Sequence, residues 1–383
     1  MLSKLTKMLI LCVTAILFQI NVFPQTYGFQ GQLSAWIAGN NGEDSKMYIG
    51  LRYIPIISIE KSLAKKYTID AEFSLNAYGT GQVHSFDNIE TDGEIKPYRM
   101  WLRFSSSQFE ARLGLQKINF GSATLLRPLM WFDRIDPRDP LQITDGVYGL
   151  LFRYYFLNNA NIWLWGLYDN DETKGLELNP TANKSIEYGS RFQAPLYKGE
   201  IAFTYHHRQT ALSKEIFAQD QPDNQSVPEN RFALDGKWDI GVGFWVESVI
   251  IHQESEALQY PWHRAINIGL DYTFGIGNGL NVLGEHFVLE YSKKAFASGE
   301  GISFSALLLN YPLGILDNIR GIIYYDWSNK ELYRFVNWQR TYDRWSFYII
   351  GFWNPEQFLI YQSQRKNNLF SGKGFQIMTV FNH

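Results

Sequence analysis

The chain has 383 residues and a formal net charge of -3, which argues against general nucleic-acid binding. Its single cysteine, Cys12, lies near the N-terminus, so the rest of the chain can form neither a disulfide nor a thiolate metal site. The mean hydropathy of -0.23 is slightly polar, yet 16% of the residues are aromatic. This combination is typical of a membrane β-barrel, although a carbohydrate-binding β-sandwich or β-propeller would have a similar composition.

The first 25 residues have the layout of a secretory signal peptide. Lys4 and Lys7 precede an uncharged apolar stretch over residues 8–20. That stretch is shorter than the ~20 residues that a transmembrane helix needs. We therefore expect residues 1–25 to be a signal peptide. We expect residues 26–383 to form one exported domain, because no linker rich in proline, glycine or serine divides them.

Alternation of apolar and polar residues predicts strands throughout this domain. In the clearest case, residues 68–78, apolar side chains at Ile69, Ala71, Phe73, Leu75 and Ala77 alternate with polar side chains at Asp70, Glu72, Ser74 and Asn76. About 18 strands are expected, with 16 as the alternative count. They lie near residues 28–39, 46–59, 67–78, 97–105, 109–119, 147–157, 161–168, 185–194, 200–208, 230–239, 241–252, 264–274, 280–291, 302–311, 318–327, 331–340, 344–353 and 373–382.

The connections between these strands alternate between short and long. Short ones are expected at residues 105–108, 157–159, 239–241, 275–279 and 341–343, and long polar ones at 79–96, 169–184, 209–229 and 253–263. Outer-membrane barrels have short periplasmic turns on one rim and long external loops on the other. A β-propeller would repeat one motif per blade, and the sequence has no such repeat.

The predicted fold is therefore an all-β, antiparallel, up-and-down transmembrane β-barrel in the outer membrane of a Gram-negative bacterium. A last strand with Phe381 close to its end is typical of proteins that the barrel assembly machinery inserts. We expect outer-membrane lipids and that machinery to be partners.

The segment from Gly121 to Gly146 differs from every other connection. Its three prolines and seven charged residues make a continuous strand improbable, and its Leu, Met, Trp and Phe residues make it a poor solvated loop. We expect it to fold back into the barrel, where irregular backbone is tolerated next to water. Its charged residues would then form a pore constriction: Arg127, Asp133, Arg134, Asp136, Arg138 and Asp139, with Asp145 nearby. The alternative is an external loop held by internal salt bridges.

A family resemblance covers the same region. The run Arg112-Leu-Gly-Leu-Gln-Lys-Ile-Asn-Phe-Gly121, followed by Arg127-Pro128, Asp133, Asp136-Pro137 and Asp139-Pro140, resembles the signature of alginate-export-type and related outer-membrane porins. The resemblance implies a barrel of about 18 strands in which this stretch leads into an inserted loop.

Arginines dominate the predicted inner face of the early strands. The expected lumen-lining residues are Arg99, Arg103, Arg112, Gln116, Arg153 and Arg191, accompanied by the acids Asp70, Glu72, Glu110 and Glu187. Such arginines would favour anionic or polyhydroxylated solutes, unless the acids neutralise them across the lumen.

The function expected from these features is a porin-like channel for the diffusion of small hydrophilic solutes, with anions and saccharides as the candidate classes. One alternative is export of an exopolysaccharide or capsule, suggested by aromatic residues in loops such as Trp131, Tyr260 and Trp262. Another is a structural barrel that conducts nothing.

Catalysis and cofactor binding are not expected. The sequence has no Gly-x-Ser-x-Gly elbow. His206 and His207 are adjacent on a predicted strand, so they should point to opposite faces and not share a metal, and we expect them at the membrane interface. Residues 169–173 resemble the start of a calcium loop, but Lys174 occupies the position where that loop needs glycine.

Overall fold

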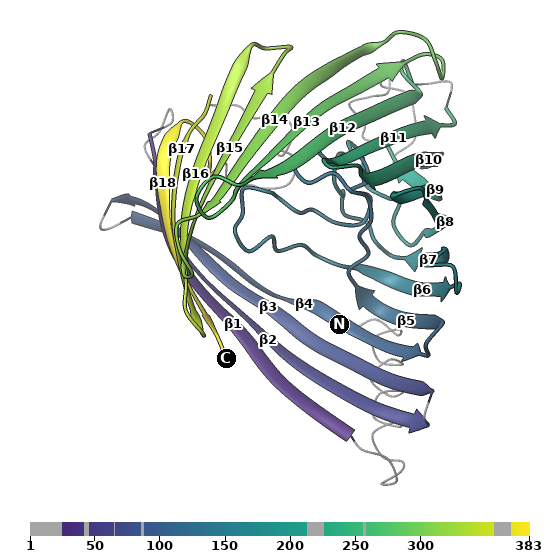
Figure 1. The fold of residues 1–383 in the computed structure, drawn as a ribbon, viewed down its shortest axis with the longest axis horizontal. Coiled ribbons are helices and arrows are strands. Elements are labelled where there is room, and N and C mark those ends of the chain that lie inside the picture. The colour runs from purple at the N-terminus through teal and green to yellow at the C-terminus, as the bar shows by residue number, and fades with distance from the viewer. Residues whose placement is uncertain are drawn as a thin grey trace.

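The protein folds as one closed antiparallel sheet of 18 strands. The computed structural model describes residues 25–41, 46–64, 66–85, 88–212, 226–255, 258–355 and 369–383. Each strand pairs with the next along the chain, and β1 also pairs with β18, from Gln32 opposite Asn382 to Asn40 opposite Gly374. This pairing closes the barrel, so the predicted fold class and strand number are confirmed (Figure 1).

The strands are β1 (Gln25–Asn40), β2 (Lys46–Ala64), β3 (Tyr67–Ser85), β4 (Asn88–Ser105), β5 (Phe109–Gln116), β6 (Val147–Tyr155), β7 (Asn161–Tyr168), β8 (Ile186–Leu196), β9 (Gly199–Ala211), β10 (Ser226–Asp239), β11 (Gly243–Gln253), β12 (Trp262–Phe274), β13 (Leu280–Ser292), β14 (Glu300–Pro312), β15 (Asp317–Asp326), β16 (Glu331–Thr341), β17 (Trp345–Trp353) and β18 (Lys373–Asn382). The described residues include no helix with the length and apolar character needed to cross a membrane. The predicted signal peptide lies outside them, apart from Gln25.

The two rims of the barrel carry different connections. One rim has short connections, such as 106–108, 197–198, 240–242 and 342–344. The opposite rim has the long ones, among them 117–146, 169–185 and 354–372. The predicted alternation of short and long connections is thus confirmed at most positions.

The predicted long connection over residues 79–96 is wrong. β3 continues to Ser85 and β4 already begins at Asn88, with Thr80 opposite Asp92 and Gln82 opposite Glu90 in an antiparallel ladder. Polar residues here do not mark a loop, because their backbone groups still pair across the hairpin. Lipid contact does not constrain strand residues that extend past the apolar band, so alternation is lost while the strand persists.

Alternation along each strand separates the outer face from the inner face. On β3, Phe73 is 41% exposed on the outer face, while Asp70, Ser74 and Asn76 are buried on the inner face. This outcome confirms the period-two interpretation of residues 68–78.

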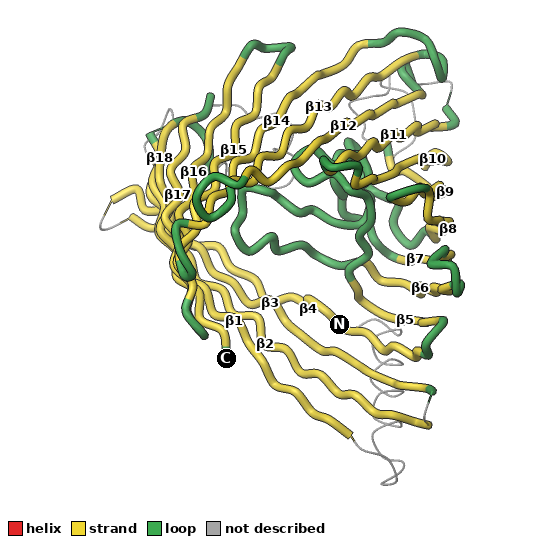
Figure 2. Tube along the Cα trace, in the orientation of Figure 1, coloured by secondary structure: helices red, strands yellow, loops and turns green. Residues whose placement is uncertain are grey.

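The inner wall is not polar throughout. Apolar side chains on the inner faces of β13 to β17 are buried, including Phe287, Phe304, Tyr324, Phe335 and Phe352. They belong to one cluster with the apolar residues of segment 117–146. The inner wall can be apolar here because this connection covers it and water does not (Figure 2).

Candidate functional site: the inserted segment and the arginine cluster

The connection between β5 and β6, residues 117–146, lies inside the barrel and not above its rim, as Figures 1 and 2 show. Leu125, Leu126, Leu129, Met130 and Phe132 are all buried in the cluster that the inner wall forms. Burial removes the apolar surface of these side chains from water. In an external loop the same surface would be exposed. The predicted inward fold of this segment is therefore confirmed.

The charged residues of the segment pair mainly with one another. Arg127 lies 3.1 Å from Asp133, and Arg138 lies 2.9 Å from Asp136. Asp139 caps a turn by accepting the backbone N–H of Leu141 at 3.0 Å. The internal salt bridges that we considered for an external loop thus exist, but inside the barrel. Pairing gives Arg127, Asp133, Asp136 and Arg138 a stiffening role, and their part in a pore constriction stays a prediction.

Two further contacts tie the segment to neighbouring elements. Arg134 forms an ion pair of 2.9 Å with Glu172, in the connection between β7 and β8. On the return leg, Asp145 forms an ion pair of 2.8 Å with Lys96 of β4, and Arg99 donates a hydrogen bond of 3.0 Å to the carbonyl of Thr144. The segment is therefore held at its tip and at its C-terminal end.

Three of the predicted lumen arginines come together around one acid. Glu110 lies 3.1 Å from Arg153, 3.6 Å from Arg103 and 3.8 Å from Arg112. Asp70 adds a second acid, 2.9 Å from Arg103. We call these five residues the arginine cluster; it carries three positive and two negative charges.

Tryptophan rings support the arginine cluster. The guanidinium of Arg153 lies 3.6 Å from the ring centroid of Trp163, and that of Arg112 lies 4.7 Å from the centroid of Trp101. Stacking on an indole fixes the plane of a guanidinium and leaves its N–H edge free to donate. The Arg103 side chain is 33% exposed, so the cluster reaches water.

The other predicted lumen-lining residues lie elsewhere. Gln116 is 0% exposed and donates hydrogen bonds to the carbonyls of Arg112 and Gly149. Arg191 is 4% exposed and forms an ion pair of 2.7 Å with Asp235. Both point inward but are covered, so their description as lumen-lining needs correction. Arg99 is buried as well, through its contact with the segment.

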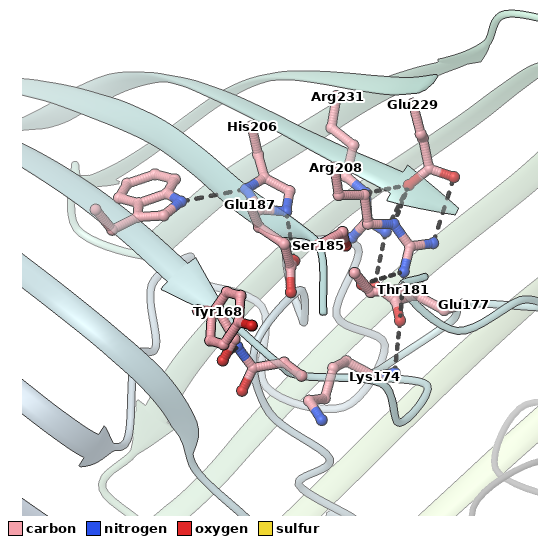
Figure 3. A network of polar contacts seen from close by, with 12 residues as sticks. Tyr168, Lys174, Glu177, Thr181, Ser185, Glu187, His206, Arg208, Glu229 and Arg231 are labelled. Atoms are coloured by element: carbon pink, nitrogen blue, oxygen red, sulfur yellow. Dashed lines mark hydrogen bonds and ion pairs between the residues drawn. The ribbon is translucent and has the colours of Figure 1, made fainter. Parts of the chain in front are cut away.

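Sequence reasoning missed a second polar network, which holds the connection 169–185 against the inner wall (Figure 3). Arg208 and Arg231 each lie 2.6 Å from Glu229, and Glu177 lies 3.1 Å from Arg208 and 2.6 Å from Arg231. All four side chains are buried. Only the facing positions of Arg208 and Glu229 on paired strands could have been foreseen, because Glu177 is far from both in sequence.

His206 lies deeper than expected. It is buried on the inner face, whereas His207 lies on the outer face, so the expected opposite orientation is confirmed and the interfacial position is wrong for His206. Trp165 Nε1, which can only donate, lies 3.2 Å from Nδ1 of His206. Nδ1 must therefore accept, which leaves Nε2–H to donate to Glu187 at 3.2 Å (Figure 3). His206 is accordingly neutral.

Lys174 is a buried cation in the connection 169–185. No ion pair or hydrogen bond of its Nζ occurs among the described residues, and burial lowers its pKa, as does nearby Arg134. Neighbouring Glu172 pairs with Arg134, and Asn170 bonds to the backbone of Tyr148. Within the described residues, no three His, Cys, Asp or Glu side chains are grouped to hold a metal ion.

The aromatic residues that suggested sugar binding are not arranged for it. Trp131 is buried in the cluster of the inserted segment. Trp262 stacks on His252 with ring centroids 4.0 Å apart, and Tyr260 donates a hydrogen bond to Glu300. Trp101 and Trp163 are among the partly exposed rings on the inner wall.

Comparison with known proteins finds similarity of structure but not of sequence. No protein-family model matches the chain, and no curated protein matches it. Among solved structures, OccK7 of Pseudomonas aeruginosa matches with a TM-score of 0.56 and 8% identity, over 93% of this chain and 99% of that chain. OmpT of Vibrio cholerae matches with a TM-score of 0.51 and 12% identity, over 94% and 99%. OmpF of Salmonella typhi, in a complex with daunomycin, matches with a TM-score of 0.50 and 9% identity, over 93% and 97%. At such identities the likeness is one of fold, and the fold is that of the bacterial outer-membrane porins.

Proposed function

We propose that the chain is an outer-membrane channel through which small hydrophilic solutes diffuse, with a preference for anions. The observation that carries this proposal is the arginine cluster, where Arg103, Arg112 and Arg153 surround Glu110 on the inner wall. The five residues of the cluster together carry an excess of one positive charge. A stationary charge in a confined aqueous path raises the local concentration of counter-ions.

We propose that segment 117–146 narrows the path along which these solutes pass. Its buried, internally paired charges support a stiff obstruction more than a strong local field. Selectivity would then come from the wall, and the size limit from the segment. Arg127, Asp133, Arg134, Asp136, Arg138 and Asp139 remain its candidate residues.

Recordings from single channels in planar lipid bilayers test both parts. The purified barrel should produce discrete conductance steps, and a salt gradient should give a reversal potential on the anion-selective side. Replacing residues 126–139 by a short glycine-serine linker should increase the step size. If neither the native nor the shortened barrel produces steps, the channel proposal fails.

The remaining assignments complete the proposal. Residues 1–25 would be a signal peptide removed on export, and residues 26–383 one barrel domain, inserted by the barrel assembly machinery among outer-membrane lipids. The proposal assigns no catalytic activity to the chain. A kinship with alginate-export-type porins is supported by the motif over residues 112–140, which leads into the inserted segment. If a strain that lacks this protein lost its surface polysaccharide, the alternative function of polysaccharide export would be supported. Unchanged surface polysaccharide would rule that alternative out.

A further inference from the structure

Two buried carboxylates on the inner wall bind the backbone at the start of the inserted segment. Glu285 of β13 accepts the N–H of Thr124 at 2.6 Å, of Leu125 at 3.1 Å and of Leu126 at 2.7 Å. Glu247 of β11 accepts the N–H of Ala123 at 2.7 Å and that of Ser122. Five consecutive backbone donors therefore end on two acids.

These acids lack the partners that buried carboxylates usually have. Glu247 is 1% exposed and Glu285 is 4% exposed, and among the described residues neither lies within ion-pair distance of a cation. Burying an unpaired charge is costly unless hydrogen bonds compensate it, and here the segment itself supplies those bonds. The position of the segment against the wall and the ionisation of the two acids are therefore coupled.

The surroundings of the two acids differ. Glu247 faces Asp235 of β10, which is paired with Arg191, and Arg127 of the segment, which is paired with Asp133. Glu285 accepts a hydrogen bond from Asn267 of β12 and is in register with Ala306 of β14, and no cation among the described residues forms an ion pair with it.

Their bonding also differs, and this difference is decisive. Both N–H groups at Glu247 end on Oε1, while Oε2 is buried and no described residue forms a hydrogen bond with it. A proton or an amide nitrogen can therefore occupy Oε2 without displacing a bond. At Glu285 both oxygens are in use, since Oε1 accepts from Thr124 and Oε2 from Leu125, Leu126 and Asn267. A proton on either oxygen of Glu285 would point toward an N–H donor, so protonation there would displace a hydrogen bond.

We propose that Glu285 is a positioning residue that holds residues 124–126 of the segment against the wall only while it is ionised, whereas Glu247 holds residues 122–123 when it is neutral. Acidification then releases the segment at Glu285, which makes the segment's position sensitive to pH. This inference rests on the proposed function in one respect: the position of the segment would set the width of the channel.

Thiol labelling tests directly whether the segment lies against the inner wall. The chain's single cysteine, Cys12, falls in the predicted signal peptide, so a cysteine introduced at Leu126, which is 1% exposed, gives a clean probe. Its rate of reaction with a water-soluble maleimide reports how often the segment leaves the wall. Ile315→Cys, on a fully exposed turn, serves as the reference that corrects for the pH dependence of the reagent.

In the Leu126→Cys background, Glu285→Gln should raise the normalised labelling rate at neutral pH about tenfold, the factor for losing one hydrogen bond to a charged group. Glu247→Gln should leave it within about twofold, because the amide nitrogen takes the vacant Oε2 position. Glu290→Gln is the matched control, since Glu290 lies on the outer face of the same strand and pairs with Arg264. Equal rates in all variants, or equal acceleration by Glu247→Gln and Glu285→Gln, would overturn the proposal.

A second measurement covers the case in which Glu285→Gln does not fold. With the native glutamate in place, the normalised rate at Leu126→Cys should rise between about pH 7.5 and pH 4, the range in which glutamates take up protons. A flat profile overturns the proposal. Because labelling needs no ion flow, a barrel that conducts nothing would refute the channel and leave this test of the anchor intact.

Discussion

Neutralising the acid at the centre of the arginine cluster should make the barrel more selective for anions. Glu110→Gln changes the cluster from three positive and two negative charges to three positive and one negative. The arginines should stay in place, because Nε–H of Arg103 keeps its hydrogen bond to both carboxylate oxygens of Asp70 and Arg153 keeps its stack on Trp163. The variant therefore alters charge with little change of shape.

The size of the effect follows from Coulomb's law. A solute ion about 6 Å from the changed charge in water gains or loses about 0.7 kcal/mol, which is roughly a threefold change in its local concentration. The anion gains this energy and the cation loses it, so the ratio of anion to cation permeability, obtained from the reversal potential in a potassium chloride gradient, should rise about tenfold at low salt. The effect should shrink as salt screens the charge.

A matched control removes an acid from the outer face at the same rim. Asp317 begins β15 next to a short connection and pairs loosely with Arg340 at 3.8 Å. Asp317→Asn should leave the permeability ratio unchanged, while Arg153→Gln should lower it. If Glu110→Gln gave the same ratio as the native barrel, solutes would not pass the arginine cluster, and the basis of the proposed selectivity would be lost.

Three other substitutions test how the interior is held together, all measured by urea unfolding in lipid vesicles. Trp131→Ala opens a cavity in the buried cluster and should cost about 3–5 kcal/mol of unfolding free energy. Glu177→Ala leaves Arg208 and Arg231 to share one acid and should cost a similar 3–5 kcal/mol, whereas a loss below about 1 kcal/mol would show that the network does not hold the connection. Lys174→Met should stabilise by about 1 kcal/mol at neutral pH. Because burial lowers the pKa of Lys174 in the folded state, the charged form is the costly one, so this gain should fade as pH rises toward the ordinary lysine pKa of 10.5; a gain independent of pH would contradict it.

The strands were predictable because lipid on one side and a packed interior on the other impose a period of two. Where lipid contact ends, the alternation of apolar and polar residues ends too. The sequence therefore predicts a loop at the polar hairpin of β3 and β4, although Thr80 and Asp92 pair within it. The arginine cluster could also be foreseen in part, since Arg103 and Arg112 are register partners on adjacent strands and Glu110 and Arg153 are partners on the next pair.

What the sequence could not predict is which inward side chains the segment covers. Arg153 and Arg191 look alike in the pattern, but Arg191 is buried with Asp235 and Arg153 is not. Likewise Glu285 resembles any lumen-facing acid on a strand. Its role depends on where a distant backbone comes to rest, and local periodicity carries no information about such contacts.

The interior therefore divides into two parts with different physical tasks. From β11 to β17 the inner wall is largely apolar and is covered by the segment, whose backbone is satisfied by Glu247, Asn267 and Glu285. From β3 to β7 the wall keeps Arg103, Arg112 and Arg153 partly exposed. A solute that crosses the barrel would meet the second part, where the arginines of the cluster reach water. The motif that begins at Arg112 thus contributes to both tasks, with an arginine in the cluster at its start and the covering segment at its end.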